Sequence, residues 1–370
     1  MTIYAHITGW GMSLPDKILT NDEMATFVDT NDKWIRERTG IESRRIASDE
    51  DTTASLGAEA ALKALQMANL NPHDVDLVIV STSSPEHIFP STASLVQDRI
   101  GAINAGAFDL LAACTGFIYA LNLATQNIRS GSIQNAVVIG SETLSRLIDW
   151  TDRTTCILFG DGAGAFVLQA NETPGGVISS ILRSDGSGGD LLSVPAGGSK
   201  LPASMDTIQA GKHFVQMNGR EVFRFATRVM ARASQEAMEK AEWNVDDVSL
   251  IIPHQANLRI IDAAARGLKL PLDRFAINVQ KYGNTSTASI PLATIEAFEE
   301  GRLQPNDKII MVGFGAGLTW GAVAAIWSGP LPTEKPVNFT AQRLLTAIRS
   351  RILRLYRRIE GFIWGRGKSA

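Results

Sequence analysis

The chain has 370 residues, 45% of them hydrophobic and 20% charged, which is ordinary for an α/β protein with a sizeable core in two domains or one large pseudo-symmetric one. Its net charge is −3, but residues 331–370 carry nine Lys and Arg against two acidic residues, a net +7 that leaves −10 for the rest. This acidic body argues against nucleic-acid binding. Two cysteines are too few for a disulfide framework and indicate a reducing compartment.

The N-terminus and the histidines argue against further classes. The first six residues lack the basic and apolar regions of a signal peptide. No run of about 18 apolar residues predicts a transmembrane helix, so we expect a cytoplasmic protein. The five histidines show no ligand spacing with cysteines or carboxylates, so we expect no metal site.

A helix–turn–strand unit occurs twice at an offset of 173 residues. Residues 64–79 and 237–252 each have the pattern of an amphipathic helix, an acidic turn and a buried strand. Apolar strands alternating with helices predict parallel sheets covered on both faces. We therefore expect two pseudo-repeated βα halves, 1–172 and 173–329. The first contains Cys114, and the second contains His254 and Asn284.

Cys114 lies between small residues in the segment Leu111–Phe117, at what reads as the start of a helix. Unpaired N–H groups at a helix N-terminus lower the pKa of a thiol, and the thiolate is the reactive nucleophile. Taken alone, Cys114 is equally consistent with a small core residue. Cys156 lies in an apolar strand pattern, and we expect it to be inert.

Two polar residues complete the pattern. His254 directly follows the apolar strand 250–253, and Asn284 lies in a glycine turn that opens a helix. His254 alone would more often be structural than catalytic. A nucleophile, an imidazole and an amide donor together are the parts of a thioester-processing site, so we expect an enzyme. The 173-residue offset also aligns Cys114 with Thr287, which predicts that the two turns face each other.

Two glycine-rich segments, 160–164 and 313–317, resemble nucleotide loops only superficially. Neither fits Gly-x-Gly-x-x-Gly after a first strand, and no Walker-type Gly-Lys-Ser/Thr is present. We interpret both as tight turns that bring backbone N–H groups to the active site.

The segments around Cys114, His254 and Asn284, with Phe314–Gly321, give the chain a resemblance to the β-ketoacyl-acyl-carrier-protein synthase III family. This resemblance runs from about residue 3 to Trp327. It implies a thiolase-like α/β fold in five layers, α-β-α-β-α, and a homodimer. It also implies decarboxylating Claisen condensation of an acyl-CoA with malonyl-acyl-carrier protein to 3-oxoacyl-carrier protein, CO2 and CoA. No cofactor is implied besides the CoA and phosphopantetheine thioesters.

The resemblance also implies residue roles. Cys114 matches the residue that carries the acyl group as a thioester, while His254 and Asn284 match the pair that binds the malonyl thioester carbonyl during decarboxylation. Negative charge builds on that oxygen, and positioned donors in a dry site would stabilise it. The oxyanion of the second step would be held by the backbone N–H groups of Cys114 and Ala316, the latter standing where many relatives have glycine.

By the same resemblance, Trp34 and Arg153 sandwich the adenine of CoA and Arg38 meets its phosphates. Aromatic and guanidinium faces suit a purine, and a fork of donors suits a phosphate. The alternative is that Trp34 is a partly exposed helix residue and Arg38 forms a surface pair.

Two further sets follow from the resemblance and from charge. A contact with the carrier protein is predicted at Arg224, Gln255, Arg259 and Arg266. For the arginines, the alternative is that they are solvated surface charges. An acyl pocket is predicted at Leu144, Phe159 and, reaching in from the partner subunit, Phe89.

The last forty residues lie beyond the resemblance. Prolines mark a linker over 330–340, and residues 341–370 read as a basic amphipathic helix. Its apolar positions are Leu344, Leu345, Ile348, Ile352, Leu355, Tyr356, Ile359, Phe362 and Ile363, followed by Trp364. The pattern is typical of a helix on a membrane surface. Docking on the protein's own dimer, or on another enzyme, are the alternatives.

Two other functions are compatible with these residues. A protein of the same fold could prime polyketide or secondary-metabolite synthesis, or transfer acyl groups to oxygen or nitrogen. Intact His254 and Asn284 favour condensation over simple transfer. A non-catalytic scaffold localised by its tail is disfavoured, since a scaffold needs no nucleophile.

Overall fold

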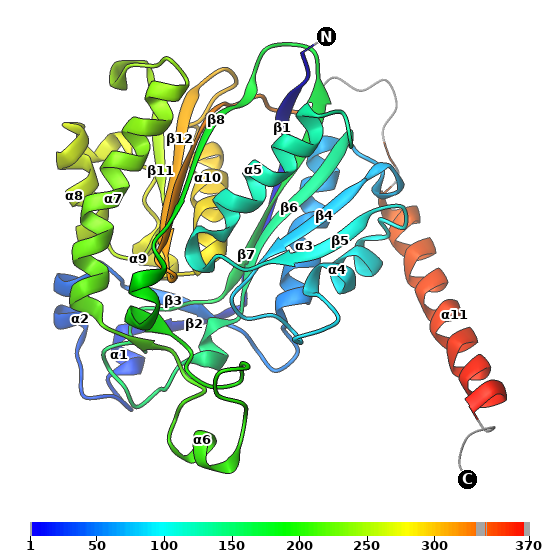
Figure 1. The fold of residues 1–370 in the computed structure, drawn as a ribbon, viewed down its shortest axis with the longest axis horizontal. Coiled ribbons are helices and arrows are strands. Elements are labelled where there is room, and N and C mark those ends of the chain that lie inside the picture. Colours follow the sequence, from blue (N-terminus) through cyan, green and yellow to red (C-terminus); the bar gives the residue numbers. More distant parts are fainter. Residues whose placement is uncertain (1, 331–336, 338, 366–370) are drawn as a thin grey trace.

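Two sheets organise the chain in the computed structural model, which describes residues 2–330, 337 and 339–365 (Figure 1). The strands of the first sheet are β1 (Tyr4–Ser13), β4 (Leu77–Ser81), β5 (Gly106–Leu110), β6 (Asn135–Glu142) and β7 (Gly162–Asn171). Those of the second are β8 (Gly176–Ser184), β11 (Leu250–Pro253), β12 (Lys308–Gly315) and β13 (Thr319–Ile326). The spatial orders are β1-β7-β6-β4-β5 and β11-β12-β13-β8.

The sheets are mixed, which corrects the prediction of parallel sheets. Only β4–β5, β4–β6 and β11–β12 pair in parallel, and the other neighbours are antiparallel. Strands β12 and β13 follow each other through a short turn, and such a connection can join only antiparallel strands. Apolar runs identify strands buried on both faces but do not reveal their direction.

Helices separate and cover the two sheets in five layers (Figure 1). Helices α3 (Thr53–Ala68) and α4 (Thr92–Ile100) pack on the outer face of the first sheet, α5 (Gly116–Arg129) and α10 (Ser289–Glu299) lie between the sheets, and α7 (Gly219–Lys240) and α8 (Leu258–Leu268) cover the second. Three buried apolar clusters fill the spaces between these layers. The predicted α-β-α-β-α arrangement is confirmed.

Smaller elements surround this body. They are β2 (Lys17–Thr20), α1 (Asn21–Met24), α2 (Asp32–Thr39), β3 (Ser43–Ile46), β9 (Leu192–Ser193), α6 (Met205–Gln209), β10 (Gln216–Met217) and α9 (Val279–Tyr282). The 3₁₀ turns are η1 (Pro72–Asp74), η2 (Ala113–Thr115), η3 (Leu144–Leu147), η4 (Gly186–Leu191), η5 (Val245–Asp247), η6 (Leu272–Arg274) and η7 (Ser286–Ala288).

The sequence explains why α3 packs so closely on β1. Its alanine-rich face is preceded by a capping box in which Thr52 and Ser55 satisfy each other's backbone N–H groups. On β1, a Cβ at Gly9 would lie 2.2 Å from the carbonyl oxygen of Ala64. Small residues on both elements therefore bring helix and strand backbones together.

The two repeated units fold as the sequence predicts. Residues 64–79 form the end of α3, turn η1 and strand β4, while residues 237–252 form the end of α7, turn η5 and strand β11. The first sheet takes its strands from residues 4–171 and the second from residues 176–326. A division near residue 172, between β7 and β8, stays our proposal.

One helix lies outside the five layers. Helix α11 (Phe339–Gly365) starts two residues before the predicted tail and extends along one side of the body, beside α4 (Figure 1). Most of the predicted linker, and the side chains of Leu344, Phe362, Ile363 and Trp364, lie outside the described residues. None of the described helices is both long enough and apolar enough to cross a membrane.

Candidate active site

The nucleophile turn lies where β5 gives way to α5. Cys114 is the middle residue of η2, and α5 begins two residues later at Gly116. The turn is tied to the second sheet: the Thr319 hydroxyl lies 3.1 Å from the Thr115 hydroxyl, and the Thr115 hydroxyl donates to the carbonyl of Thr319 at 3.2 Å. Backbone strain is visible one residue earlier, because Ala113 has a φ of 45°. The turn that carries the Cys114 thiol is therefore fixed by hydrogen bonds between the two halves of the chain.

Burial dominates the chemistry of the Cys114 thiol. Desolvation raises its pKa to about 12, whereas a hydrogen bond with the Ser286 side chain acts in the opposite direction. The nearby Glu142 carboxylate raises it further. The expected lowering by the helix N-terminus is therefore wrong for the resting enzyme, because desolvation of a fully buried thiolate outweighs it. Cys156 is also buried, which raises its pKa to about 11 and fits the inert role predicted for it.

His254 is placed by the end of β11. The last residue of that strand pairs with Val312, and the His254 N–H donates to the Val312 carbonyl at 2.8 Å. The imidazole packs edge-on against Phe314, with ring centroids 5.2 Å apart. Its burial lowers the pKa to about 3, so the ring is neutral at physiological pH.

The hydroxyl of Ser289 determines which ring nitrogen carries the proton. Its Oγ lies 2.7 Å from Nδ1 of His254 and 2.8 Å from the carbonyl oxygen of Ser286. A hydroxyl has one proton to donate. If it donates to Ser286, Nδ1 must carry the imidazole proton and Nε2 is bare. If it donates to Nδ1, Nε2 carries the proton and becomes a donor.

Asn284 is fixed through both its backbone and its side chain. Its N–H donates to Leu158 at 2.8 Å, and its carbonyl accepts from Gly160 at 3.0 Å. Its side-chain Oδ1 accepts from the backbone N–H of Ser286 at 2.8 Å. This donor identifies the oxygen end of the amide, so the Nδ2 group is the end left to donate to a substrate.

These three side chains line one cavity of about 80 Å³. The rest of its wall is largely apolar and comes from the second half of the chain, with one contribution from the 158–159 segment: Leu158, Phe159, Leu192, Met217, Val222, Phe223, Ile260 and Phe314. Phe159, predicted for the acyl pocket, is therefore in contact with the site. A small cavity with an apolar lining leaves little room for water beside the three polar groups. Their electrostatic interactions with a substrate are therefore stronger than in water.

Glu142 is a buried carboxylate below the nucleophile that sequence reasoning missed. It ends β6 and accepts hydrogen bonds from the Ser84 hydroxyl at 2.5 Å, the Ser83 N–H at 3.0 Å and the Thr287 hydroxyl at 3.1 Å. Burial raises its pKa, and a hydrogen bond from Ser286 opposes the rise. Ser286 thus lies between Glu142 and Cys114. A carboxylate at the end of an apolar strand was the available signal.

The glycine segment 313–317 approaches the nucleophile closely. A Cβ at Gly315 would lie 2.7 Å from the backbone nitrogen of Cys114 and 3.1 Å from that of Thr115. Only glycine permits this approach. Ala316, predicted to supply an oxyanion donor, follows directly in the turn from β12 to β13.

Known proteins match most of this chain. A model of 3-oxoacyl-[acyl-carrier-protein] synthase III matches residues 108–186, and a model of its C-terminal part matches 238–327. A β-ketoacyl-[acyl-carrier-protein] synthase III of Desulfitobacterium hafniense is 51% identical over 322 residues, covering 87% of this chain and 97% of that protein. One from a Roseiflexus species is 47% identical over 328 residues, covering 89% and 100%. The chain belongs to the β-ketoacyl-acyl-carrier-protein synthase III family.

Solved structures of synthase III enzymes share the fold. That of Aquifex aeolicus superposes with a TM-score of 0.81 at 45% identity, covering 87% of this chain and 99% of that one. The priming β-ketosynthase of the R1128 polyketide pathway gives 0.82 at 35% identity, covering 89% and 97%. The thiolase-like fold class and the family resemblance are both confirmed.

The residues predicted to bind CoA lie together. Trp34 and Arg38 belong to α2, and Arg153 comes from a later loop. The guanidinium carbons of Arg38 and Arg153 lie 5.6 and 5.4 Å from the centre of the Trp34 ring. Arg153 also donates to the Asp29 carbonyl at 3.0 Å.

The predicted carrier-protein residues divide into two groups. Arg224, Arg259 and Arg266 are exposed on α7 and α8. Arg224 pairs with Glu221 at 3.3 Å, Arg259 lies over the Phe223 ring at 5.2 Å, and Arg266 pairs with Asp262. Gln255 is different, being only 1% exposed. Its amide donates to the carbonyls of Pro253 and Ala276 and accepts the N–H groups of Asn278 and Val279. These hydrogen bonds from Gln255 therefore fix the loop that precedes α9.

Two predicted pocket residues are not among those that line this cavity. Phe89 is 85% exposed in the loop before α4, and Leu144 is buried in η3 among the apolar residues around α2. Within the described residues, no group of three or more His, Cys, Asp or Glu side chains could hold a metal ion.

Proposed function

We propose that this chain condenses an acyl-CoA with malonyl-acyl-carrier protein to give 3-oxoacyl-acyl-carrier protein, CoA and CO2, the step that initiates fatty-acid synthesis. The supporting observation is the meeting of Cys114, His254 and Asn284, from three distant segments, in one apolar cavity. The reaction needs no cofactor besides its two thioester substrates.

In the first step, Cys114 attacks the thioester carbonyl of acyl-CoA. The new C–S bond replaces the bond to CoA, and the thiol proton ends on the departing CoA sulfur. Because burial keeps the thiol protonated at rest, the proton must leave as the substrate arrives. The Nδ1–H form of His254 offers a bare Nε2 that can accept a hydrogen bond from the thiol while its proton passes to the CoA sulfur.

In the second step, the malonyl thioester loses CO2 and negative charge moves onto its carbonyl oxygen. The Nδ2 group of Asn284 and the Nε2–H of His254 donate to that oxygen. Between the two steps, while CoA leaves, the neutral ring loses its Nδ1 proton to water and takes one up at Nε2, and the Ser289 hydroxyl then donates to Nδ1. The carbanion attacks the acyl-Cys114 carbonyl, whose oxyanion accepts from the backbone N–H groups of Cys114 and Ala316. The C–S bond to Cys114 then breaks, and the released thiolate takes up one proton from water to restore the resting thiol.

Intact mass spectrometry of the full chain tests this proposal. After incubation with acyl-CoAs of different length, the wild type should gain the mass of one acyl group and the Cys114→Ala variant should not. Cys156→Ala is the matched control, since it removes the second buried thiol and should leave the adduct unchanged. No adduct on the wild type, or one retained in Cys114→Ala, would reject Cys114 as the nucleophile.

We further propose that CoA binds at Trp34, Arg38 and Arg153, and that the carrier protein contacts Arg224, Arg259 and Arg266. The two arginines beside Trp34 and the basic groups on α7 and α8 support this assignment. Trp34→Ala should raise the KM for acyl-CoA and leave that for the carrier protein unchanged, whereas Arg259→Ala should do the reverse. The same shift in both constants would contradict separate sites.

The working unit that we propose is a homodimer in which Phe89 enters the acyl pocket of the other copy. Ile88 and Phe89 are both more than four-fifths exposed, and β5 is an edge strand whose neighbouring Leu111 is also exposed. Light scattering should give twice the chain mass. A Phe89→Ala variant that stays dimeric should change the preferred acyl length. An unchanged preference would remove Phe89 from the pocket.

Priming of polyketide synthesis is the second candidate, and the 35% identity to the R1128 priming ketosynthase favours it over other transfers. Assays with fatty-acid and polyketide carrier proteins side by side distinguish the two, since the preferred carrier should give the higher kcat/KM.

We place the enzyme in the cytoplasm and propose peripheral contact with a membrane through residues 341–370. Helix α11 is basic, with six arginines against Glu360. In Figure 1 it lies on the opposite side of the body from α2 and α8, which carry residues proposed above to bind CoA and the carrier protein. Contact on that side would leave these substrate-binding residues open to solvent.

A further inference from the structure

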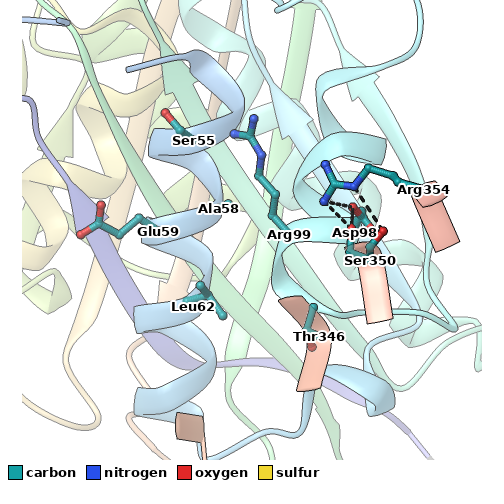
Figure 2. Close-up of a pocket in the computed structure, with 9 residues that line it drawn as sticks. All are labelled: Ser55, Ala58, Glu59, Leu62, Asp98, Arg99, Thr346, Ser350 and Arg354. Atoms are coloured by element: carbon teal, nitrogen blue, oxygen red, sulfur yellow. Dashed lines mark hydrogen bonds and ion pairs between the residues drawn. The ribbon is translucent and has the colours of Figure 1, made fainter. Parts of the chain in front are cut away.

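Helix α11 rests on the body through polar residues, as Figure 2 shows. The Ser350 hydroxyl donates to the Asp98 carboxylate at 2.6 Å, and Arg354 reaches the same carboxylate at 3.7 Å and the Ser350 oxygen at 2.5 Å. One turn earlier, Thr346 packs on α4 where Gly101 has no side chain. Phe339, at the start of α11, packs against the apolar cluster formed by α3 and α4, whereas the contacts at Thr346, Ser350 and Arg354 are small or polar.

Six large apolar side chains of α11 point elsewhere. At 100° per residue they fall within about 100° of the helix circumference and extend about 21 Å along it, away from the docked face. Each is between 45% and 64% exposed: Leu345, Ile348, Ile352, Leu355, Tyr356 and Ile359. We call these six residues the outer stripe. A contiguous exposed apolar stripe of this kind marks a contact surface.

Arginines border the outer stripe on both sides. Arg349 lies along one edge, with Arg351 and Arg358 along the other. Arg351, Arg354 and Arg358 surround Leu355 in a surface hollow of about 460 Å³. Among the described residues, only Arg354 of these three has an ion-pair partner. Long arginine side chains beside an apolar stripe can reach phosphates while the stripe enters hydrocarbon.

We propose that the outer stripe and the arginine hollow bind the surface of an anionic phospholipid membrane, with a lipid phosphate in the hollow. This deepens the peripheral contact proposed above by naming its ligand and residues. A second copy of α11 is a poorer occupant, because it would bring two sets of six arginines together. The matched synthase III proteins are covered over 97–100% of their length by 87–89% of this chain, and the family match ends at residue 327, before α11 begins. The surface is thus an addition to a complete enzyme.

Co-sedimentation of the full-length protein with vesicles tests the proposal. Vesicles of phosphatidylcholine with about one-third phosphatidylglycerol should bind the protein, and pure phosphatidylcholine should bind it far less. High salt should weaken binding, because exposed charges are screened. Protein that stays in the supernatant with both compositions would overturn the proposal.

Three double variants identify the residues. Arg351→Gln with Arg358→Gln should weaken binding about ten-fold or more, since each basic residue near an anionic surface contributes on the order of 1 kcal/mol. Ile352→Ser with Ile359→Ser should weaken it by a similar factor by removing the stripe. Arg232→Gln with Lys269→Gln removes two exposed charges from α7 and the end of α8 and should leave binding unchanged. Equal loss in this control would mean that net charge alone attracts the protein, which rejects the site.

Two further measurements separate this proposal from the others. Condensation with soluble substrates should be unchanged in all three variants, because none of these residues lies in the cavity. Failure of the catalytic proposal therefore leaves vesicle binding untouched, and the reverse also holds. If the stripe variant instead lowers the mass of the assembly by light scattering, a second protein copy covers the stripe and the membrane proposal is wrong.

Discussion

The nucleophile turn and α11 are held to the body by opposite kinds of contact. Around Cys114, hydroxyl and backbone hydrogen bonds fix a turn whose neighbours Phe117 and Ile118 are completely buried. On α11, hydrogen bonds face the body and the six apolar side chains of the outer stripe face outward. Since burial of apolar surface is the main source of stability, the turn depends on the whole core, whereas α11 adds little to it.

The strongest test of this difference removes a side chain from the centre of the core. Phe166 on β7 is fully buried and packs edge-on against Phe117 at 5.2 Å and Trp327 at 6.0 Å. Phe166→Ala should lower the free energy of unfolding by about 3–5 kcal/mol, measured by chemical denaturation. A loss below about 1 kcal/mol would contradict a tightly packed core beneath the nucleophile.

Loss of the amide donor should separate the two half-reactions. Asn284→Ala should lower the condensation rate about 10²–10³-fold, because one donor to the developing oxyanion is lost. Acylation of Cys114 by acyl-CoA should stay within a few-fold of wild type. Asn127→Ala, at a half-buried position of α5 outside the cavity, is the control. Equal losses in both half-reactions would show that Asn284 supports the cavity rather than the oxyanion.

Because the His254 imidazole is buried, we expect the free energy of unfolding to fall at acid pH. Because burial lowers the folded-state pKa of His254 to about 3, only the unfolded chain binds this proton between pH 6.5 and 3, so stability falls as the pH falls. From pH 7 to pH 5 this group should cost about 2 kcal/mol. The His254→Gln variant should lose correspondingly less over the same interval in denaturation experiments. Identical losses would mean that His254 is solvated in the folded protein.

Ser289 offers a finer test of the site. Ser289→Ala should slow malonyl decarboxylation about ten-fold, because the Nε2–H form of His254 loses the hydrogen bond that favours it. Ser289→Thr keeps a hydroxyl and should restore much of the rate. The ¹⁵N shifts of the His254 ring should differ between wild type and Ser289→Ala. Unchanged shifts with a lower rate would assign Ser289 a structural role only.

The smallest effect is expected on α11. Ile352→Ala should change the free energy of unfolding by less than about 0.5 kcal/mol, because the side chain is already 59% exposed. The same denaturation experiment as for Phe166→Ala measures it. A loss above about 1 kcal/mol would indicate that a second copy covers the stripe.

Much of the site could be predicted because its three reactive residues have distinct local signals. Cys114 at a helix start, His254 after a strand and Asn284 in a glycine turn are each recognisable in sequence. Their supporting hydroxyls are not, because Ser and Thr are common and only the fold brings Ser289 to His254. The prediction that the Cys114 pKa is lowered was also wrong. A local sequence pattern reveals the end of the helix but not how deeply the thiol is buried.

The fold was predictable to a similar extent. Repeated helix–turn–strand units indicated two α/β halves, but strand direction depends on connections such as the short β12–β13 turn. For α11, periodicity predicted an apolar face without saying which face docks. The docked residues Thr346 and Ser350 look like solvent-facing positions in sequence.

The buried thiol also has a consequence for oxidative damage. Peroxides and alkylating agents react with thiolates, and susceptibility follows thiolate character and access. Cys114 is 8% exposed and stays protonated far above physiological pH. The resting enzyme is therefore protected from sulfenic acid formation, and the risk is confined to the moments when a substrate draws the proton away. The same burial that delays activation preserves the enzyme between turnovers.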